Sequence, residues 1–360
     1  MADRVGGKWL FGGGILGCAT LTLFTPAAAN LHVVAVIALR MLEGMFEGLM
    51  FPATHALLSR WTPRSQTTRS ATIAFSGQEC GIVIGTLLAG VLCDHGFAGG
   101  WPSVFYVFGT IGCVWSAAWF LLCYNSPSTH PRISTAEREY LDVLIGKPAV
   151  VEKSRTPWRK IFTSGPLLAC CVAKFAHNWG YHTILDGLPL FYFDVLGFNM
   201  TKNGLMASLP FLAACIMLLV TGQLADWLRA LDNTTRVRKI FISFGLVLPS
   251  VFFILSGFLG CHRALVVLTM ITALGCSAFA WASVSVNSLD LSVTHAATLL
   301  GITNSSATLA SILCAQTFGA LTYSRSTLAQ WRKVFYLAAA VEWLGTIVYL
   351  LFGSGEPQGW

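Results

Sequence analysis

The sequence predicts an all-α polytopic membrane protein with about ten transmembrane helices. Of its 360 residues, 55% are hydrophobic and only 11% are charged, and the mean hydropathy is +0.66. Soluble domains carry about 25% charged residues, so this composition excludes one. The apolar residues form runs long enough to cross a hydrocarbon core of about 30 Å. These runs cover residues 10–29, 33–58, 70–93, 102–124, 164–195, 203–225, 239–260, 264–288, 297–322 and 332–352.

The basic residues indicate which connections face the cytoplasm. The net charge is +7, and Lys and Arg cluster in the connections around residues 60–69, 132–160 and 229–239. Short loops rich in Lys and Arg stay in the cytoplasm, and alternation from these loops places both termini there. The basic residues are dispersed and follow no nucleic-acid-binding motif. The expected partner of these surfaces is therefore the lipid bilayer, and no nucleic acid.

A short motif repeats and divides the chain into two halves. ADRVGGK at residues 2–8 resembles LADWLRA at residues 224–230, with Asp3 aligned to Asp226. Four predicted spans follow each copy, but two spans precede the second copy and only Met1 precedes the first. Two six-helix halves, as in secondary transporters, explain this pattern. The chain is then expected to lack two N-terminal helices, because of a truncated gene model, an alternative start or fragmentation.

This division predicts four regions. Residues 1–124 form an incomplete N-terminal bundle of four spans, and residues 125–163 form a cytoplasmic loop between the bundles. Residues 164–352 form a C-terminal bundle of six helices, and residues 353–360 form a cytoplasmic tail.

The second apolar run carries a cluster of charged residues. Arg40, Glu43, Glu47 and His55 lie in a helix predicted over residues 33–58. At about 100° per residue, with Arg40 at zero, the other three fall near 300°, 340° and 60°, so all four share one face within roughly 120°. Charged side chains in a span face a bundle interior or a wet cavity and mark an ion or substrate path. We therefore expect this face to carry function.

The residue types on this face suit proton-coupled movement of an anion. Arg40 is the candidate anion contact, because a guanidinium offers a carboxylate two charge-assisted hydrogen bonds and keeps its proton. Glu47 is the preferred proton carrier, and Glu43 is its proton-coupling partner, which Arg40 holds ionised. His55 is either a proton relay or a polar residue at the cytoplasmic interface. The alternative for Arg40 is a purely structural ion pair with Glu43 or Glu47.

A second polar group lies in the run 164–195. Gly180, Gly187 and Pro189 interrupt this run, as in the broken helices at transporter midplanes. The candidate substrate contacts here are His177, Asn178 and Tyr181, and Asn287 and Asn304 are candidates to complete the site from later spans. For each of these side chains, polar contact between packed helices is the alternative.

No motif indicates an enzyme. The sequence contains no nucleophile and base set, no metal-ligand spacing and no phosphate loop. Its eleven cysteines are scattered through the spans without a CxxC pair, as expected for small buried apolar residues. We therefore expect no cofactor and no bound metal, and the charged face of the run 33–58 indicates H⁺ as the coupling ion.

Several blocks resemble a known family. These blocks are RMLEGMFEGLMFPATHALLSRW, WPSVFYVFGTIGCVW, AHNWGYHTILDGLPLFYF, VNSLDLSVTHAATLLGITNSSAT and VFYLAAAVEWLG. They resemble the anion/cation symporter family of the major facilitator superfamily, which includes sialin, the vesicular glutamate transporters and the type I phosphate cotransporters. The likeness is strongest to the sialin branch. It implies a twelve-helix fold, of which this chain carries helices 3 to 12, and alternating access.

The family also implies a function. Its members move organic anions such as sialic acid and acidic amino acids, coupled to protons or sodium, out of lysosomes or into vesicles. Arg40, Glu43, Glu47 and His55 match the charged positions of the family's fourth helix, where coupling and anion recognition are thought to lie. His177 stands where the glutamate branch has an arginine, which argues against glutamate as the main substrate.

The sequence therefore predicts a proton-coupled transporter of small organic anions. A lysosomal or vesicular membrane is the expected location, with the plasma membrane as the alternative. Two other functions stay open. One is sodium-coupled transport of inorganic phosphate by the same fold, and the other is a truncated regulator that does not transport and associates with a full-length relative.

Overall fold

The computed structural model describes residues 6–62, 67–137, 156–231, 233–260, 262–292, 295–323 and 326–358. Within these ranges it contains thirteen α-helices and no strand, which confirms the all-α prediction. Eight of the described helices are long and apolar enough to cross a membrane. The chain divides into two compact units, one formed by Met1–Phe75 with Val91–Val150 and the other by Ser76–Gly90 with Val151–Trp360.

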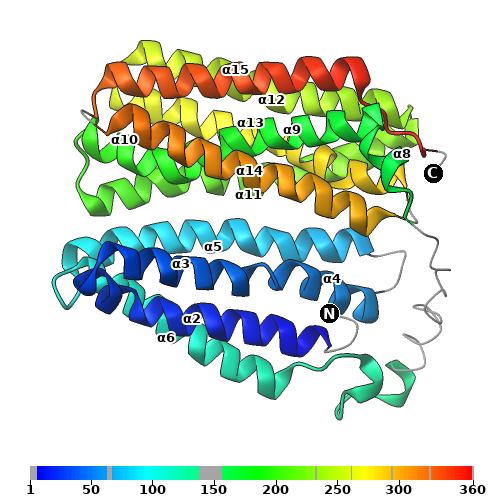
Figure 1. Ribbon diagram of the computed structural model, residues 1–360, viewed down its shortest axis with the longest axis horizontal. Coiled ribbons are helices and arrows are strands. Elements are labelled where there is room, and N and C mark those ends of the chain that lie inside the picture. The colour runs from blue at the N-terminus through cyan, green and yellow to red at the C-terminus, as the bar shows by residue number, and fades with distance from the viewer. Residues whose placement is uncertain are drawn as a thin grey trace. The chain divides into compact units, whose positions relative to one another are not determined.

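The first unit is a small helical bundle. Helix α2 packs against α3, α4 and α6, and its place beside them can be followed in Figure 1. The unit also holds both ends of α5 and the short 3₁₀ helix η2. The bounds are α2 Gly7–Leu31, α3 Val33–Glu47, α4 Met50–Trp61, α5 Thr67–His95, α6 Trp101–Leu122 and η2 Pro127–Thr129.

The run predicted as one helix over residues 33–58 is divided in two, and the prediction of one continuous helix is wrong. Helix α3 ends at Glu47 and α4 begins at Met50. Pro52 has no N–H to donate to the carbonyl of Gly48 four residues earlier. The backbone N–H of Leu49 donates to the carbonyl of Phe46 at 3.1 Å, in a tighter turn. The projection onto a single face therefore applies only to Arg40, Glu43 and Glu47, because His55 lies on α4.

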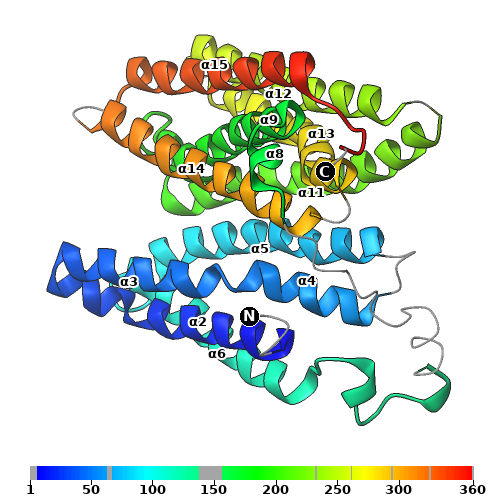
Figure 2. The same cartoon turned by 45° about the vertical axis from the view of Figure 1, so that its right-hand side comes forward.

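The second unit is the larger bundle. Helix α12 packs against α13 and α15, α11 packs against α13, and α9 packs against α14 and α15, and these neighbours run side by side in Figures 1 and 2. The bounds are α8 Trp158–Phe162, α9 Gly165–His182, η3 Thr183–Gly187, α10 Leu188–Asp194, α11 Met200–Leu231, α12 Thr234–Leu259, α13 Arg263–Leu291, α14 Ala296–Thr322 and α15 Leu328–Phe352.

The core of this unit is aromatic at one end. Phe191 of α10 packs edge-on against Trp331 and Phe335 of α15, with ring centroids 5.5 and 5.2 Å apart. Phe253 of α12 stacks on Phe335 at 6.2 Å. All four rings are almost fully buried. Rings of this size bury the most apolar area per residue, so this cluster holds α10, α12 and α15 together.

The run 164–195 departs from regular α-helix, but it is not the broken helix that was predicted, because the backbone at both junctions stays helical. Helix α9 ends at His182, the π-helical segment η3 covers Thr183–Gly187, and α10 continues to Asp194. Pro189 lies in the first turn of α10, and its missing N–H removes one bond of the ladder. Segments of π-helix are rare and frequently occur at functional sites.

Three predictions about organisation stay predictions. The first is the division of the chain at residues 124 and 164, and the second is the cytoplasmic placement of both termini. The third is the repeated motif, since Asp3 and the side chain of Asp226 fall outside the described residues. Residues 138–155 of the predicted inter-bundle loop fall outside them as well.

Helices α12 and α13 approach closely at Gly245, which gives a stability prediction. A Cβ atom there would lie 2.8 Å from the Cβ of Ala280 and against its backbone nitrogen. Gly245→Ala is expected to lower the free energy of unfolding by about 1–3 kcal/mol, because the two backbones must separate. The measurement is thermal unfolding of the purified protein in detergent.

Gly222 on α11 is the matched control. Outside the neighbouring turns of α11, a Cβ atom at Gly222 would meet no heavy atom of a described residue within 4 Å. Gly222→Ala is therefore expected to be neutral or to stabilise by up to about 1 kcal/mol through helix propensity. Equal unfolding midpoints for the two variants would show that the α12–α13 contact tolerates the added methyl group.

Candidate functional site

The first group of polar residues lies on α3. Arg40 donates from Nη1 to Oε2 of Glu43 at 2.7 Å. Thr22 of α2 donates from Oγ1 to the other carboxylate oxygen, Oε1, at 3.1 Å. Glu43 is buried, with 4% of its surface exposed, whereas half of the Arg40 side chain is exposed. Both oxygens of Glu43 are therefore satisfied, and this residue fixes the guanidinium of Arg40 relative to α2 and α3.

Glu47 differs from Glu43 in having no hydrogen-bond or ion-pair partner among the residues that the structure describes. It lies one helical turn after Glu43 on the same face, and it is exposed. The neighbouring ion pair joins Arg40 to Glu43 and leaves Glu47 outside it. A carboxylate held in no ion pair can gain or lose a proton without breaking one. His55 lies on α4, and its side chain is outside the described residues.

The second group lies in the second unit, around a cavity of about 200 Å³. His177 and Asn178 lie three and four residues after Lys174, and four and three residues before Tyr181, so the four side chains share one face of α9. Three of them, His177, Asn178 and Tyr181, line the cavity. The remaining lining residues come from α5, α9, η3, α11 and α13: Gln78, Glu79, Ile82, His182, Leu185, Ala214, Leu218, Leu274, Ser277, Ala278 and Trp281.

Two polar atoms at this cavity are buried and lack a hydrogen-bond partner among the described residues. These are Nδ1 of His177 and Oε2 of Glu79. The other oxygen of Glu79, Oε1, accepts a hydrogen bond from the Tyr181 hydroxyl at 3.3 Å. A buried polar atom without a partner costs about 1–3 kcal/mol. The cavity therefore presents an imidazole nitrogen and a carboxylate oxygen that a polar ligand can engage.

The cavity also has aromatic and apolar walls. The indole of Trp281 lies 5.8 Å from the His177 ring, and Tyr181 lies 6.4 Å from the same ring. Ile82 and Leu185 contribute apolar surface. A few polar groups set among aromatic and aliphatic side chains are typical of small-molecule sites.

Two predicted substrate contacts lie away from this cavity. Asn287 is fully buried, and its amide Nδ2 donates to the Tyr349 hydroxyl at 2.7 Å and to the Cys170 thiol at 2.8 Å. Asn304 accepts a hydrogen bond from Lys174, with Oδ1 and Nζ 2.5 Å apart. Neither asparagine lines the cavity. Both join packed helices, which is the alternative that the sequence left open.

Lys174 is the cation nearest to this group along α9. It is buried, with 3% of its surface exposed, and its ammonium is held by Asn304 of α14. Its backbone carbonyl also accepts the Asn178 amide at 3.0 Å, which sets the rotamer of a cavity-lining side chain. Lys174 therefore positions Asn178 and brings a positive charge to the polar face of α9.

Sequence reasoning missed two acids as site residues. Glu79 lines the cavity. Glu342 of α15 is 2% exposed, its Oε2 has no hydrogen-bond partner among the described residues, and a Cβ atom at Gly180 would strike its Oε1. An acid inside a predicted span is the signal that finds such residues. Both acids carry that signal, in the runs 70–93 and 332–352.

Comparison with known sequences identifies relatives along the whole chain. The model of the Major Facilitator Superfamily matches residues 1–315. Human sialin is 42% identical over 364 residues, which cover all of this chain and 72% of sialin. Human vesicular glutamate transporter 2 is 38% identical over 366 residues, which cover all of this chain and 62% of that protein. Vesicular glutamate transporter 3 of Danio rerio is 38% identical, and this chain covers 61% of it.

Solved structures show the same fold. A bacterial homologue of the human lysosomal transporter Spinster, inward-facing and unoccupied, has a TM-score of 0.71 and 12% identity, and the match covers 98% of this chain and 85% of that one. The xylose transporter XylE from E. coli, inward-open and partially occluded, also has a TM-score of 0.71, with 10% identity and coverage of 98% and 82%. The relatives are transporters, so the expectation that this chain is not an enzyme is confirmed.

Proposed function

Because this chain belongs to the Major Facilitator Superfamily, we propose that it is a secondary active transporter that moves small organic anions by alternating access. Its similarity to sialin and to vesicular glutamate transporters over its full length supports this class of cargo. The observation that carries the proposal is the cavity beside the π-helical turn of α9–η3–α10, where His177, Asn178 and Tyr181 meet. Turns of π-helix inside longer helices frequently occur at functional sites.

The cavity supports an acidic sugar as the substrate class. Asn178 and the unpartnered oxygen of Glu79 provide a donor and an acceptor for hydroxyl groups, and Trp281 provides a flat face for a sugar ring. The positive charge of Lys174, buried on the same face of α9, favours an anion over a neutral sugar. Sialic acid combines hydroxyl groups, a ring and a carboxylate, and is the substrate we propose to test first.

Arg40 and Glu47 of the first unit are proposed to bind the anion and to carry the proton. Arg40 is held in place through its pair with Glu43 at 2.7 Å, and half of its side chain remains accessible for a carboxylate. Glu47 is the carboxylate of this helix without an ion pair among the described residues, and His55 is the proposed relay. Lysosomal or vesicular membranes, where proton gradients exist, are the proposed location.

The test is uptake of labelled sialic acid into proteoliposomes that contain the 360-residue chain. An imposed proton gradient is expected to drive uptake, a protonophore is expected to abolish it, and replacement of Na⁺ by K⁺ is expected to leave it unchanged. Uptake that requires Na⁺ would contradict proton coupling. A folded and inserted protein that takes up no sialic acid would contradict the proposed substrate, and unlabelled organic anions would then be tested as competitors for binding.

A further inference from the structure

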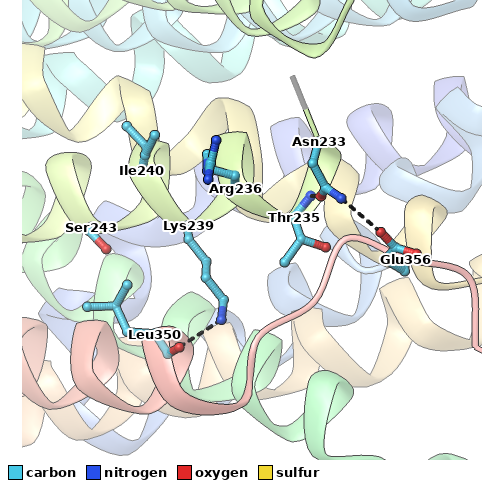
Figure 3. Close-up of a pocket in the computed structure, with 8 residues that line it drawn as sticks. All are labelled: Asn233, Thr235, Arg236, Lys239, Ile240, Ser243, Leu350 and Glu356. Carbon is cyan, nitrogen blue, oxygen red and sulfur yellow. Dashed lines mark hydrogen bonds between the residues drawn. The ribbon is translucent and has the colours of Figure 1, made fainter. Parts of the chain in front are cut away.

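A second cavity, of about 790 Å³, lies at the end of the second unit where α12 begins and α15 ends. Figure 3 shows its lining residues. They come from the first three turns of α12, the last turn of α15 and the segment that follows α15: Asn233, Thr235, Arg236, Lys239, Ile240, Ser243, Leu350 and Glu356. None of these residues belongs to the candidate transport site.

The polar part of this cavity is suited to an anion. It contains two cations, Arg236 and Lys239. Lys239 donates from Nζ to the backbone carbonyl of Leu350 at 2.8 Å, as drawn in Figure 3. An ammonium has three N–H donors, so two remain for a ligand. The N-terminus of α12, with its partial positive charge, lies at the same place. The hydroxyl oxygen of Ser243 is inaccessible and has no hydrogen-bond partner among the described residues.

One acid opposes an anion there. Glu356 lines the cavity and accepts a hydrogen bond from Nδ2 of Asn233 at 3.3 Å. The neighbouring backbone N–H of Gly355 donates to Oγ1 of Thr235 at 3.0 Å, so the segment after α15 is fastened to the start of α12. With two cations and one carboxylate, the described side chains that line this cavity carry a net positive charge.

The apolar part of the cavity continues into a surface that suits hydrocarbon. Ile240 and Leu350 line the cavity and are 56% and 45% exposed. Phe244, one turn further along α12, and Ile347 and Leu351 of α15 are exposed as well. Both helices are long and apolar enough to span a membrane. A ligand with an anionic head and acyl chains therefore matches the polar end and the exposed apolar strip together.

We propose that this cavity binds the headgroup of an anionic phospholipid, with the phosphate held by Arg236 and Lys239 and the acyl chains along α12 and α15. Basic pockets between membrane helices at the cytoplasmic surface bind such headgroups, and the basic residues 229–239 place this end in the cytoplasm by the positive-inside rule. The two cations attract the phosphate, and Glu356 weakens the attraction. This site is independent of the proposed transport function.

The test is the thermal unfolding midpoint of the purified chain in nanodiscs of phosphatidylcholine, with and without phosphatidylserine. Phosphatidylserine is expected to raise the midpoint, and titration of the lipid gives an apparent affinity. Each basic residue near an anionic lipid contributes about a factor of five, so the double variant Arg236→Gln/Lys239→Gln is expected to lose about 25-fold in affinity. Glu356→Gln is expected to bind more tightly than the unaltered chain.

Arg159 and Lys160 of α8 supply the matched control. Both are exposed cations of the same unit and neither lines the cavity, so Arg159→Gln/Lys160→Gln is expected to keep the lipid response. An equal loss in this control would overturn the proposal in favour of general surface charge. Stabilisation by inorganic phosphate in phosphatidylcholine discs, to the same extent as by phosphatidylserine, would identify a site for a soluble anion and overturn it too. Weaker binding by Glu356→Gln would also overturn it.

Discussion

Glu47→Gln is expected to abolish the concentration of an organic anion by a proton gradient while preserving its exchange across the membrane. One proton moved down one pH unit supplies about 1.4 kcal/mol. Symport of one proton with one monovalent anion is electroneutral, so this energy supports about tenfold accumulation of the anion. Glutamine resembles the protonated acid in shape but cannot release or take up a proton. The variant is therefore expected to equilibrate the anion without concentrating it.

Two assays on the same proteoliposomes separate these outcomes. Gradient-driven uptake measures coupling, and counterflow of labelled against unlabelled anion at equal pH measures movement of the loaded transporter. Glu47→Gln is expected to fail the first assay and pass the second. A variant that still concentrates the anion about tenfold would exclude Glu47 as the proton carrier.

Glu43→Gln is the control on the same helix. It removes a carboxylate that accepts hydrogen bonds from Arg40 and Thr22, so it is expected to displace Arg40 and reduce uptake and counterflow together. The two glutamates, one turn apart on α3, thus differ in the kind of defect they produce. If Glu43→Gln instead lost gradient-driven uptake and kept counterflow, Glu43 would be the proton carrier in place of Glu47.

Arg238→Met is expected to lower the free energy of unfolding by about 3–5 kcal/mol, because it removes the buried cation of an ion pair while the carboxylate of Asp290 keeps its charge. Arg238 of α12 is 2% exposed and donates from Nε to Oδ2 of Asp290 of α13 at 2.8 Å. Methionine has a similar length and supplies no charge. The measurement is unfolding of the purified protein in detergent by heat or by denaturant.

A double variant completes the cycle. Arg238→Met/Asp290→Asn removes both charges, and paired removal of a buried ion pair is far less costly than removal of one member. The double variant is therefore expected to recover more than half of the stability lost in the single variant. If the double variant were less stable than Arg238→Met, the stability lost in the single variant would not come from the charge that Asp290 retains.

The predictable part of the fold depends on local composition. Apolar runs of about twenty residues form membrane helices because the bilayer offers no other hydrogen-bond partner for the backbone. Eight of the ten predicted runs are long apolar helices. The other two are α3–α4, which is divided, and α9–η3–α10, which contains a π-helical turn. Gly187 and Pro189 predicted a departure from regular α-helix in the second run, but not its form. The division of the first run at Gly48 was not predicted, because hydropathy takes no account of the backbone N–H that Pro52 lacks.

The sequence predicted which residues belong to the candidate site, but not which of their side chains contact one another. The sequence by itself determined that charge enters the membrane at Arg40, Glu43 and Glu47 and on the polar face of α9, because the spacing of residues along a helix is fixed by its geometry. Only the tertiary structure decided which residues of other helices these side chains contact. Tyr181 meets Glu79, which is 102 residues away along the chain, and Lys174 meets Asn304 across 130. Helical periodicity relates residues within one helix, whereas contacts between helices follow from how whole faces pack, which no single segment encodes.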